Sequence, residues 1–132
     1  MKNNAQLENL KARTKRFAVE IIRFQGTLPN STESRVVGRQ MVRAGTSVGA
    51  LVREAMRAHA AVEFAETLEK GLEALEDTTY WLELLEESGI TKDHMLDALR
   101  REANELSIIL YAFAQKAKFK RRNLREMADS ME

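Results

Sequence analysis

The chain has 132 residues, a mass of 15.0 kDa and a formal net charge of +1; 44% of its residues are hydrophobic and 31% are charged. This length suffices for one hydrophobic core, and the composition, with one proline, excludes a disordered chain. Because no apolar run approaches the roughly 18 residues of a membrane span, no secretory signal is recognisable and cysteine is absent, we expect a cytoplasmic protein without disulfides.

The first two predicted helices cover the N-terminal half of the chain. Hydrophobic residues recur every three or four positions over residues 6–28, which predicts an amphipathic helix that stops before Pro29. A second helix is expected over residues 32–57, with Asn30 or Ser31 as its N-cap. The short connection between the two helices makes them antiparallel neighbours.

Three glycines in the second helix require a structural reason. Gly38, Gly45 and Gly49 fall within about 40° of one another at 100° per residue, and each costs up to about 1 kcal/mol relative to alanine. One interpretation, which we favour, is a groove that lets a neighbouring helix approach closely. The other is a break near residues 45–47 that forms a loop.

The third predicted helix has more apolar positions than one core-facing side requires. It is expected over residues 60–88, after a turn near His59, and Gly89 marks its end by favouring a left-handed backbone. Trp81 and Leu85 lie on a second apolar line of this helix. They belong either to the core or to an interface between subunits, and the surplus of apolar surface favours self-association.

The fourth helix is expected over residues 91–119, with Thr91 as its N-cap, followed by a polar, basic tail over residues 120–132. Four helices joined by short connections close most simply into an antiparallel up-and-down bundle. The sequence therefore predicts an all-α protein with one bundle domain over residues 1–119.

Catalytic and metal-binding patterns are missing from the sequence. Di-metal sites in helical bundles require a Glu-x-x-His pair on two helices, and this motif does not occur. His59, at a turn, and His94, at a helix start, are expected to be solvated or to cap a helix. We therefore expect no enzyme activity, no metal and no cofactor.

Charged residues are segregated along the chain. Residues 1–58 hold eleven Lys or Arg against four Glu, and residues 59–99 hold eleven acidic residues against two lysines. On a continuous second helix, five arginines fall in one arc of about 80°. These residues, named the arginine stripe below, are Arg35, Arg39, Arg43, Arg53 and Arg57. Guanidinium groups bind phosphate and carboxylate equally well, so the stripe either binds a nucleic-acid backbone or forms ion pairs with an acidic helix of the same or a neighbouring subunit.

Several stretches resemble one protein family. They are residues 11–18, 38–40, 44–50, 53–55, 80–85, 87–89 and 102–106. In this order they resemble the four-helix bundle proteins encoded in intervening sequences of bacterial large-subunit (23S) ribosomal RNA genes. The resemblance implies a ring-like homopentamer of unknown function, and a distant kinship with the accessory variability determinant of diversity-generating retroelements, which engages reverse transcriptase and nucleic acid.

Two functional hypotheses follow from these observations. The first is a non-catalytic, homo-oligomeric accessory protein that binds RNA or DNA through the arginine stripe. The second is a scaffold for protein–protein interactions, in which the stripe forms structural ion pairs.

Overall fold

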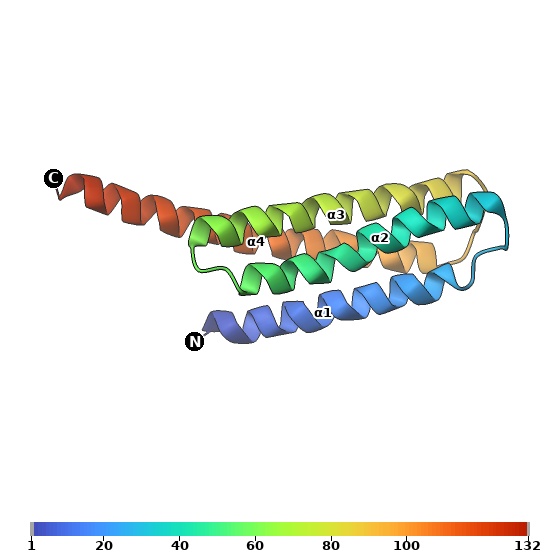
Figure 1. Ribbon diagram of the computed structural model, residues 1–132, viewed down its shortest axis with the longest axis horizontal. Coiled ribbons are helices and arrows are strands. Elements are labelled where there is room, and N and C mark those ends of the chain that lie inside the picture. Colours follow the sequence, from blue (N-terminus) through green and yellow to red (C-terminus); the bar gives the residue numbers. More distant parts are fainter. Residues whose placement is uncertain (1, 132) are drawn as a thin grey trace.

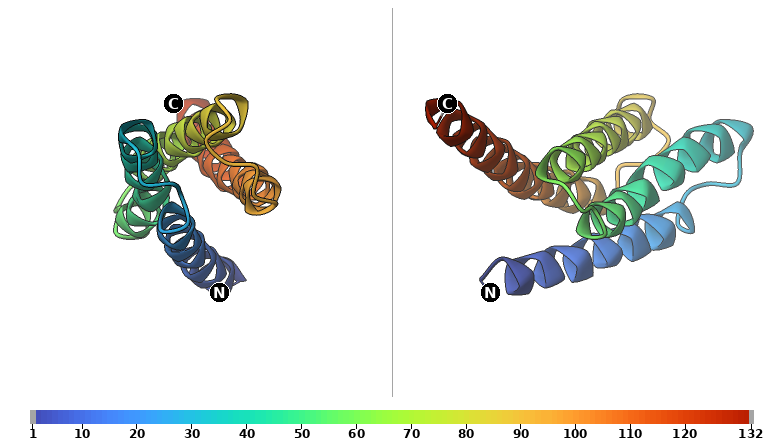
Figure 2. Two further views of the ribbon diagram at one scale, coloured as in Figure 1. Left: turned by 90° about the vertical axis from the view of Figure 1, so that its right-hand side faces the viewer. Right: turned by 60° about the vertical axis from the view of Figure 1, so that its left-hand side comes forward.

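The computed structural model describes residues 2–131, with side chains from residue 5 onward, as four antiparallel helices (Figure 1). These are α1 (Lys2–Gln25), α2 (Thr32–Met56), α3 (Ala61–Glu87) and α4 (Met95–Ser130). No strand occurs within residues 2–131, so the predicted all-α four-helix bundle is confirmed. Seen end-on, the helices follow one another around the bundle in chain order (Figure 2).

The turn between α1 and α2 begins earlier than expected. The Gly26 amide donates to the Ile22 and Arg23 carbonyls at 3.3 and 3.1 Å, and the Thr27 hydroxyl donates to the Phe24 carbonyl at 2.7 Å, so the helix closes at Gln25 instead of continuing toward Pro29. Of the two predicted N-caps of α2, Ser31 acts as the cap. Its hydroxyl accepts a hydrogen bond from the Ser34 amide at 3.2 Å.

The ends of α3 agree with the sequence prediction, whereas α4 starts late. The turn near His59 is confirmed, and Gly89 has a φ of +77°, in the left-handed region. The predicted start of α4 at Thr91 is wrong. The Thr91 hydroxyl accepts a hydrogen bond from the Asp93 amide at 3.2 Å, and the Asp93 carboxylate accepts one from the Met95 amide at 2.9 Å, so Asp93 supports the first turn of α4.

The fourth helix also runs farther than expected. It continues through Ser130, whereas the prediction placed its end at residue 119 and a tail after it; Glu132 lies outside the described residues. No glycine or proline follows Gly89, and Lys, Arg, Leu, Met and Glu all favour helix, so nothing in the sequence stops α4. Residues 120–131, named the arm below, extend beyond the other helices with every side chain exposed (Figure 1).

The glycines of α2 permit close packing against α1. A Cβ atom at Gly45 would lie 3.0 Å from Cγ1 of Ile21, and one at Gly49 would lie 3.3 Å from the Thr14 hydroxyl. All three glycines are buried and α2 is unbroken. The close-approach interpretation is therefore confirmed, and a loop at residues 45–47 is excluded.

Candidate nucleic-acid interface

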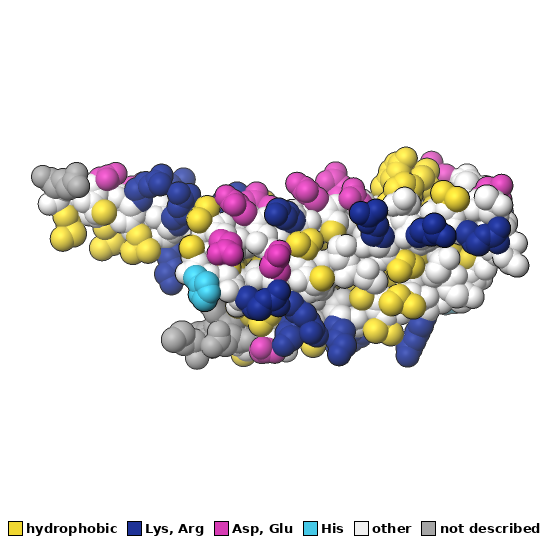
Figure 3. Space-filling model, in the orientation of Figure 1, with side chains coloured by type: hydrophobic (Ala, Val, Ile, Leu, Met, Phe, Trp, Pro, Cys, Tyr) yellow, Lys and Arg dark blue, Asp and Glu magenta, His cyan; other side chains and the backbone are white. Residues whose placement is uncertain are grey.

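The arginine stripe lies on the solvent side of α2. Because α2 buries the arc that contains Met41, Val48 and Val52, all five arginines fall outside the core and are exposed. Figure 3 shows Lys and Arg side chains in a row over α2 and the neighbouring α1, with Asp and Glu gathered over α3. From Arg35 to Arg57 the stripe extends about 33 Å at 1.5 Å per residue.

The charges of the arginine stripe are not compensated within the described part of the chain. None of the five guanidinium groups forms an ion pair with a described carboxylate. Arg35 donates to Asn30 at 2.7 Å and to Thr32 at 3.4 Å, and both acceptors are neutral. The stripe therefore retains its positive charge.

The carboxylates of α3 that form ion pairs bond to α4 instead. Glu69 lies 3.0 Å from the ammonium of Lys118, and Glu86 lies 3.0 Å from the guanidinium of Arg100. The ion pairs between the arginine stripe and the third helix are thus not formed among the described residues of one chain. An ion pair with the stripe requires an anionic group from outside these residues.

A shallow hollow interrupts the stripe between Arg43 and Arg53. It has a volume of about 330 Å³, and its lining includes Lys15 of α1 and Thr46, Gly49, Ala50 and Arg53 of α2. The small α2 residues leave room beside the backbone, and Lys15 adds a cation from the neighbouring helix. Sequence reasoning missed Lys15. Its position directly after Thr14, which packs on Gly49, is the signal that could have placed it there.

The two residues expected at an oligomer interface have different environments. Trp81 is half-buried and packs edge-on against Tyr80, with 5.0 Å between ring centroids. Leu85 is fully buried with Leu82 and Thr78, because it lies on the core side of α3. Leu85 therefore packs in the core of its own chain, whereas its neighbours Tyr80, Trp81 and Leu84 are exposed or half-buried.

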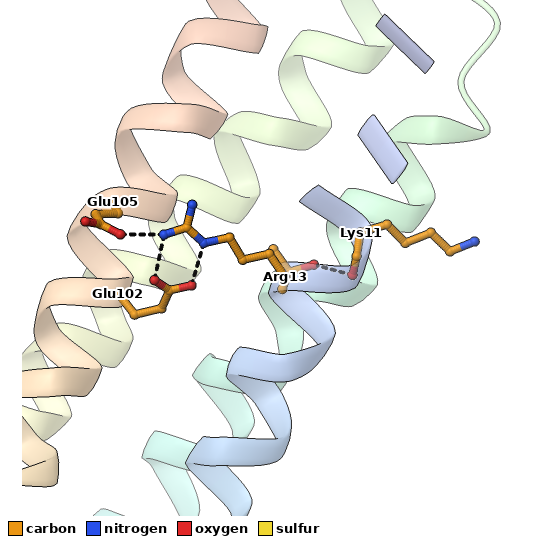
Figure 4. A network of polar contacts seen from close by, with 5 residues as sticks. Lys11, Arg13, Glu102 and Glu105 are labelled. Carbon is orange, nitrogen blue, oxygen red and sulfur yellow. Dashed lines mark hydrogen bonds and ion pairs between the residues drawn. The ribbon is translucent and has the colours of Figure 1, made fainter. Parts of the chain in front are cut away.

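Arg13 connects the first helix of the bundle to the last. It reaches from α1 to α4 and binds Glu102 through two hydrogen bonds of 2.7 and 2.8 Å, with a further contact to Glu105 (Figure 4). The hydrogen bonds with Glu102 raise the pKa of Arg13 above its ordinary value, so the guanidinium stays charged. Contacts between α1 and α4 are otherwise sparse, and an apolar groove of about 400 Å³ remains open between them.

We expect the Arg13–Glu102 pair to contribute about 1 kcal/mol to folding, because its geometry is bidentate but both side chains remain partly exposed. Denaturant unfolding of Arg13→Met, Glu102→Gln and the double variant measures the coupling. The Lys11–Glu8 pair, at 4.0 Å and more exposed, is the matched control and should show almost none. Equal coupling in the two pairs would contradict this account of Arg13.

The remaining titratable residues offer no recognisable chemical site. His59 and His94 are exposed. Where side chains are described, no group of three His, Asp or Glu residues could hold a metal ion. No helix among residues 2–131 is long and apolar enough to cross a membrane.

The fold and this surface define an antiparallel four-helix bundle protein with an exposed, arginine-rich helix face. The model of the family described as 23S rRNA-intervening sequence protein matches residues 8–112, and the chain belongs to this family. A crystal structure of a protein of unknown function from the S23 ribosomal protein family of Bacteroides thetaiotaomicron is similar, with 30% sequence identity and a TM-score of 0.76. The similarity covers 87% of this chain and 99% of that one. No curated protein matches the chain.

Proposed function

We propose that this protein is a non-catalytic, homo-oligomeric accessory factor of the cytoplasm that binds nucleic acid through the arginine stripe. The observation that carries the proposal is the exposure of five arginines without a carboxylate partner among the described residues. Arginine contacts phosphate in a bidentate manner, and the stripe's length of about 33 Å equals roughly one turn of a duplex. No aromatic residue lies between Arg35 and Arg57 in the sequence, and Tyr80 and Trp81 of α3 border the stripe at Arg43, so we expect binding to read backbone charge more than base identity.

Self-association would raise the affinity of such a surface for nucleic acid. The ring-like homopentamer implied by the family resemblance would repeat the stripe in every subunit and bring many weak phosphate contacts to one strand. The overall affinity then exceeds that of a single subunit by avidity. The family's description refers to an intervening sequence of 23S rRNA, which makes RNA the first ligand to test.

The second candidate function is a scaffold for protein partners. The observation that favours it is the exposed Tyr80, at 53% relative accessibility, beside the half-buried Trp81 and an acidic helix face. In this case the arginine stripe forms ion pairs with carboxylates of a neighbouring subunit or another protein. Substitution of these arginines then affects assembly before it affects nucleic-acid binding.

Fluorescence anisotropy with labelled 20-nucleotide RNA and DNA, single- and double-stranded, tests the proposal. We expect Arg39→Gln/Arg43→Gln to weaken duplex binding at least tenfold at low salt and to reduce the salt slope by about 1.8, because two phosphate contacts are lost. The matched control, Lys92→Gln/Arg101→Gln, removes the same charge at exposed positions outside both the stripe and the C-terminal segment of α4, and should change binding less.

Sedimentation of the same variants separates the two candidates. An unchanged oligomer with weaker binding supports nucleic-acid recognition. A dissociated oligomer after Arg39→Gln/Arg43→Gln supports the scaffold, and absence of any binding by the unmodified protein at low salt rejects the proposed function.

A further inference from the structure

The arm carries an apolar line that nothing in its own chain covers. Lys120, Leu124, Met127 and Met131 continue the spacing of the buried side of α4 at intervals of four, three and four residues. Leu124, Met127 and Met131 are 60%, 61% and 85% exposed. Figure 3 shows hydrophobic side chains along one edge of the arm. A helix with such a line is stabilised when another helix packs against it.

The arm lies outside the part of the chain that the family model matches, which ends at residue 112. The similarity to the solved structure also leaves part of this chain uncovered, although it includes 99% of that protein. Any role of the arm is therefore separate from the roles of the bundle that the family model describes.

The outer face of α3 presents a line with the same spacing. Glu73, Asp77, Tyr80 and Leu84 follow one another at intervals of four, three and four residues. Glu73, Asp77 and Tyr80 are exposed and Leu84 is half-buried, and neither carboxylate has an ion-pair partner among the described side chains. The line begins with acidic residues and ends with apolar ones.

We propose that the arm of one copy packs in parallel along the outer face of α3 of a second copy. Both lines span twelve residues, or eleven steps of 1.5 Å and about 16 Å. The arm line begins with one cation, the α3 line begins with two carboxylates, and both lines end in apolar residues. In parallel register Lys120 meets Glu73, while Met127 and Met131 meet Tyr80 and Leu84. The same register places Leu124 opposite Asp77, where Arg121 and Arg125, the neighbours of Leu124 on the helix surface, supply cations for the carboxylate.

The partner must be another chain because the arm points away from its own α3 line. The arm extends past the N-terminal end of α3, whereas Tyr80 lies about 28 Å along α3 from Ala61 (Figure 1). Each copy thus offers an arm at one place and accepts an arm at another. Because α4 is antiparallel to α3 within each copy, this parallel contact orients the second bundle opposite to the first, and two copies can exchange arms about a two-fold axis. This inference rests on the proposed self-association and is independent of nucleic-acid binding.

Engineered cysteines test the contact directly, because the chain contains no cysteine of its own. Leu84→Cys and Met127→Cys variants of the full chain are mixed without nucleic acid and treated with a short bismaleimide cross-linker. We expect a covalent product of two chains at least tenfold more abundant than from Ile108→Cys mixed with Met127→Cys. Ile108 is the control because, at 62% exposure, it is more accessible to the cross-linker than the half-buried Leu84 but lies on α4.

Charge exchange provides an independent readout. Lys120→Glu/Arg121→Glu and Glu73→Lys/Asp77→Lys should each weaken self-association at least tenfold in sedimentation, and a mixture of the two variants should restore it. Circular dichroism checks that each bundle remains folded, which we expect because these side chains are exposed. An oligomer unaffected by both exchanges, with no preferential cross-link to Leu84→Cys, overturns the arm contact but leaves self-association standing. A 15.0 kDa monomer at micromolar concentration overturns both.

Discussion

Replacement of Gly45 by leucine is expected to lower the free energy of unfolding by about 3 kcal/mol, at the upper end of typical overpacking costs. A Cβ atom at this position would already lie 3.0 and 3.1 Å from two carbons of Ile21, so the remaining atoms of leucine require α1 and α2 to move apart. The affected contact lies in the middle of α2 and near the C-terminal end of α1. We expect the thermal midpoint to fall by about 10 °C.

Two control variants separate overpacking from helix propensity. Gly45→Ala gains up to about 1 kcal/mol of helix propensity and loses part of it to the tight contact with Ile21, so its net effect should be small. Ala50→Leu adds the same side chain at an exposed position of α2 and should change stability by less than about 0.5 kcal/mol. If Gly45→Leu were as stable as Ala50→Leu, the close approach of α1 and α2 would be disproved.

The affinity for nucleic acid is expected to fall steeply as the salt concentration rises. If the five arginines of the stripe each neutralise one phosphate, the affinity for duplex should fall with a log–log slope of about −4.5. The same slope corresponds to a loss of about 500-fold between 50 and 200 mM monovalent salt. A single strand should give a shallower slope of about −3.5.

A variant with all five arginines changed to glutamine should lose most of this slope while remaining helical, because none of the five has an ion-pair partner among the described residues. The slope is measured by anisotropy titrations at four or more salt concentrations, with two unrelated base sequences. We expect nearly equal affinities for the two sequences. A slope near zero, or a preference for one sequence of more than tenfold, would contradict recognition through backbone charge.

Hydrophobic spacing predicted the fold well because helix packing repeats regularly along the chain. Residues such as Phe17, Ile21, Leu68 and Leu75 are buried where the three-and-four spacing places them. The starts and ends of helices were less predictable, since they depend on individual hydrogen bonds. The hydrogen bond from the Met95 amide to Asp93 places the start of α4 after Thr91. The arm is helical because its Lys, Arg, Leu and Met residues favour helix, although their charge is also typical of a polar tail.

The candidate site was only partly predictable. The positions of the five arginines on one face of α2 follow from helix geometry, but their freedom from carboxylates depends on where the charged residues of α3 point. The Arg13–Glu102 pair joins residues 89 positions apart, and no local spacing indicates such a contact. The sequence leaves Leu85 open to either the core or an interface because apolar residues surround it, whereas in the structure its side chain is fully buried in the core.

Photo-cross-linking of bound RNA, followed by mass spectrometry of the attached peptides, locates the nucleic-acid-binding surface. We expect cross-links within residues 35–57 of α2 and around Lys15 of α1, and their loss when the five arginines of the stripe are replaced by glutamine. Cross-links confined to the basic residues of α4, or distributed evenly over the surface, would contradict the assignment of nucleic-acid binding to the arginine stripe.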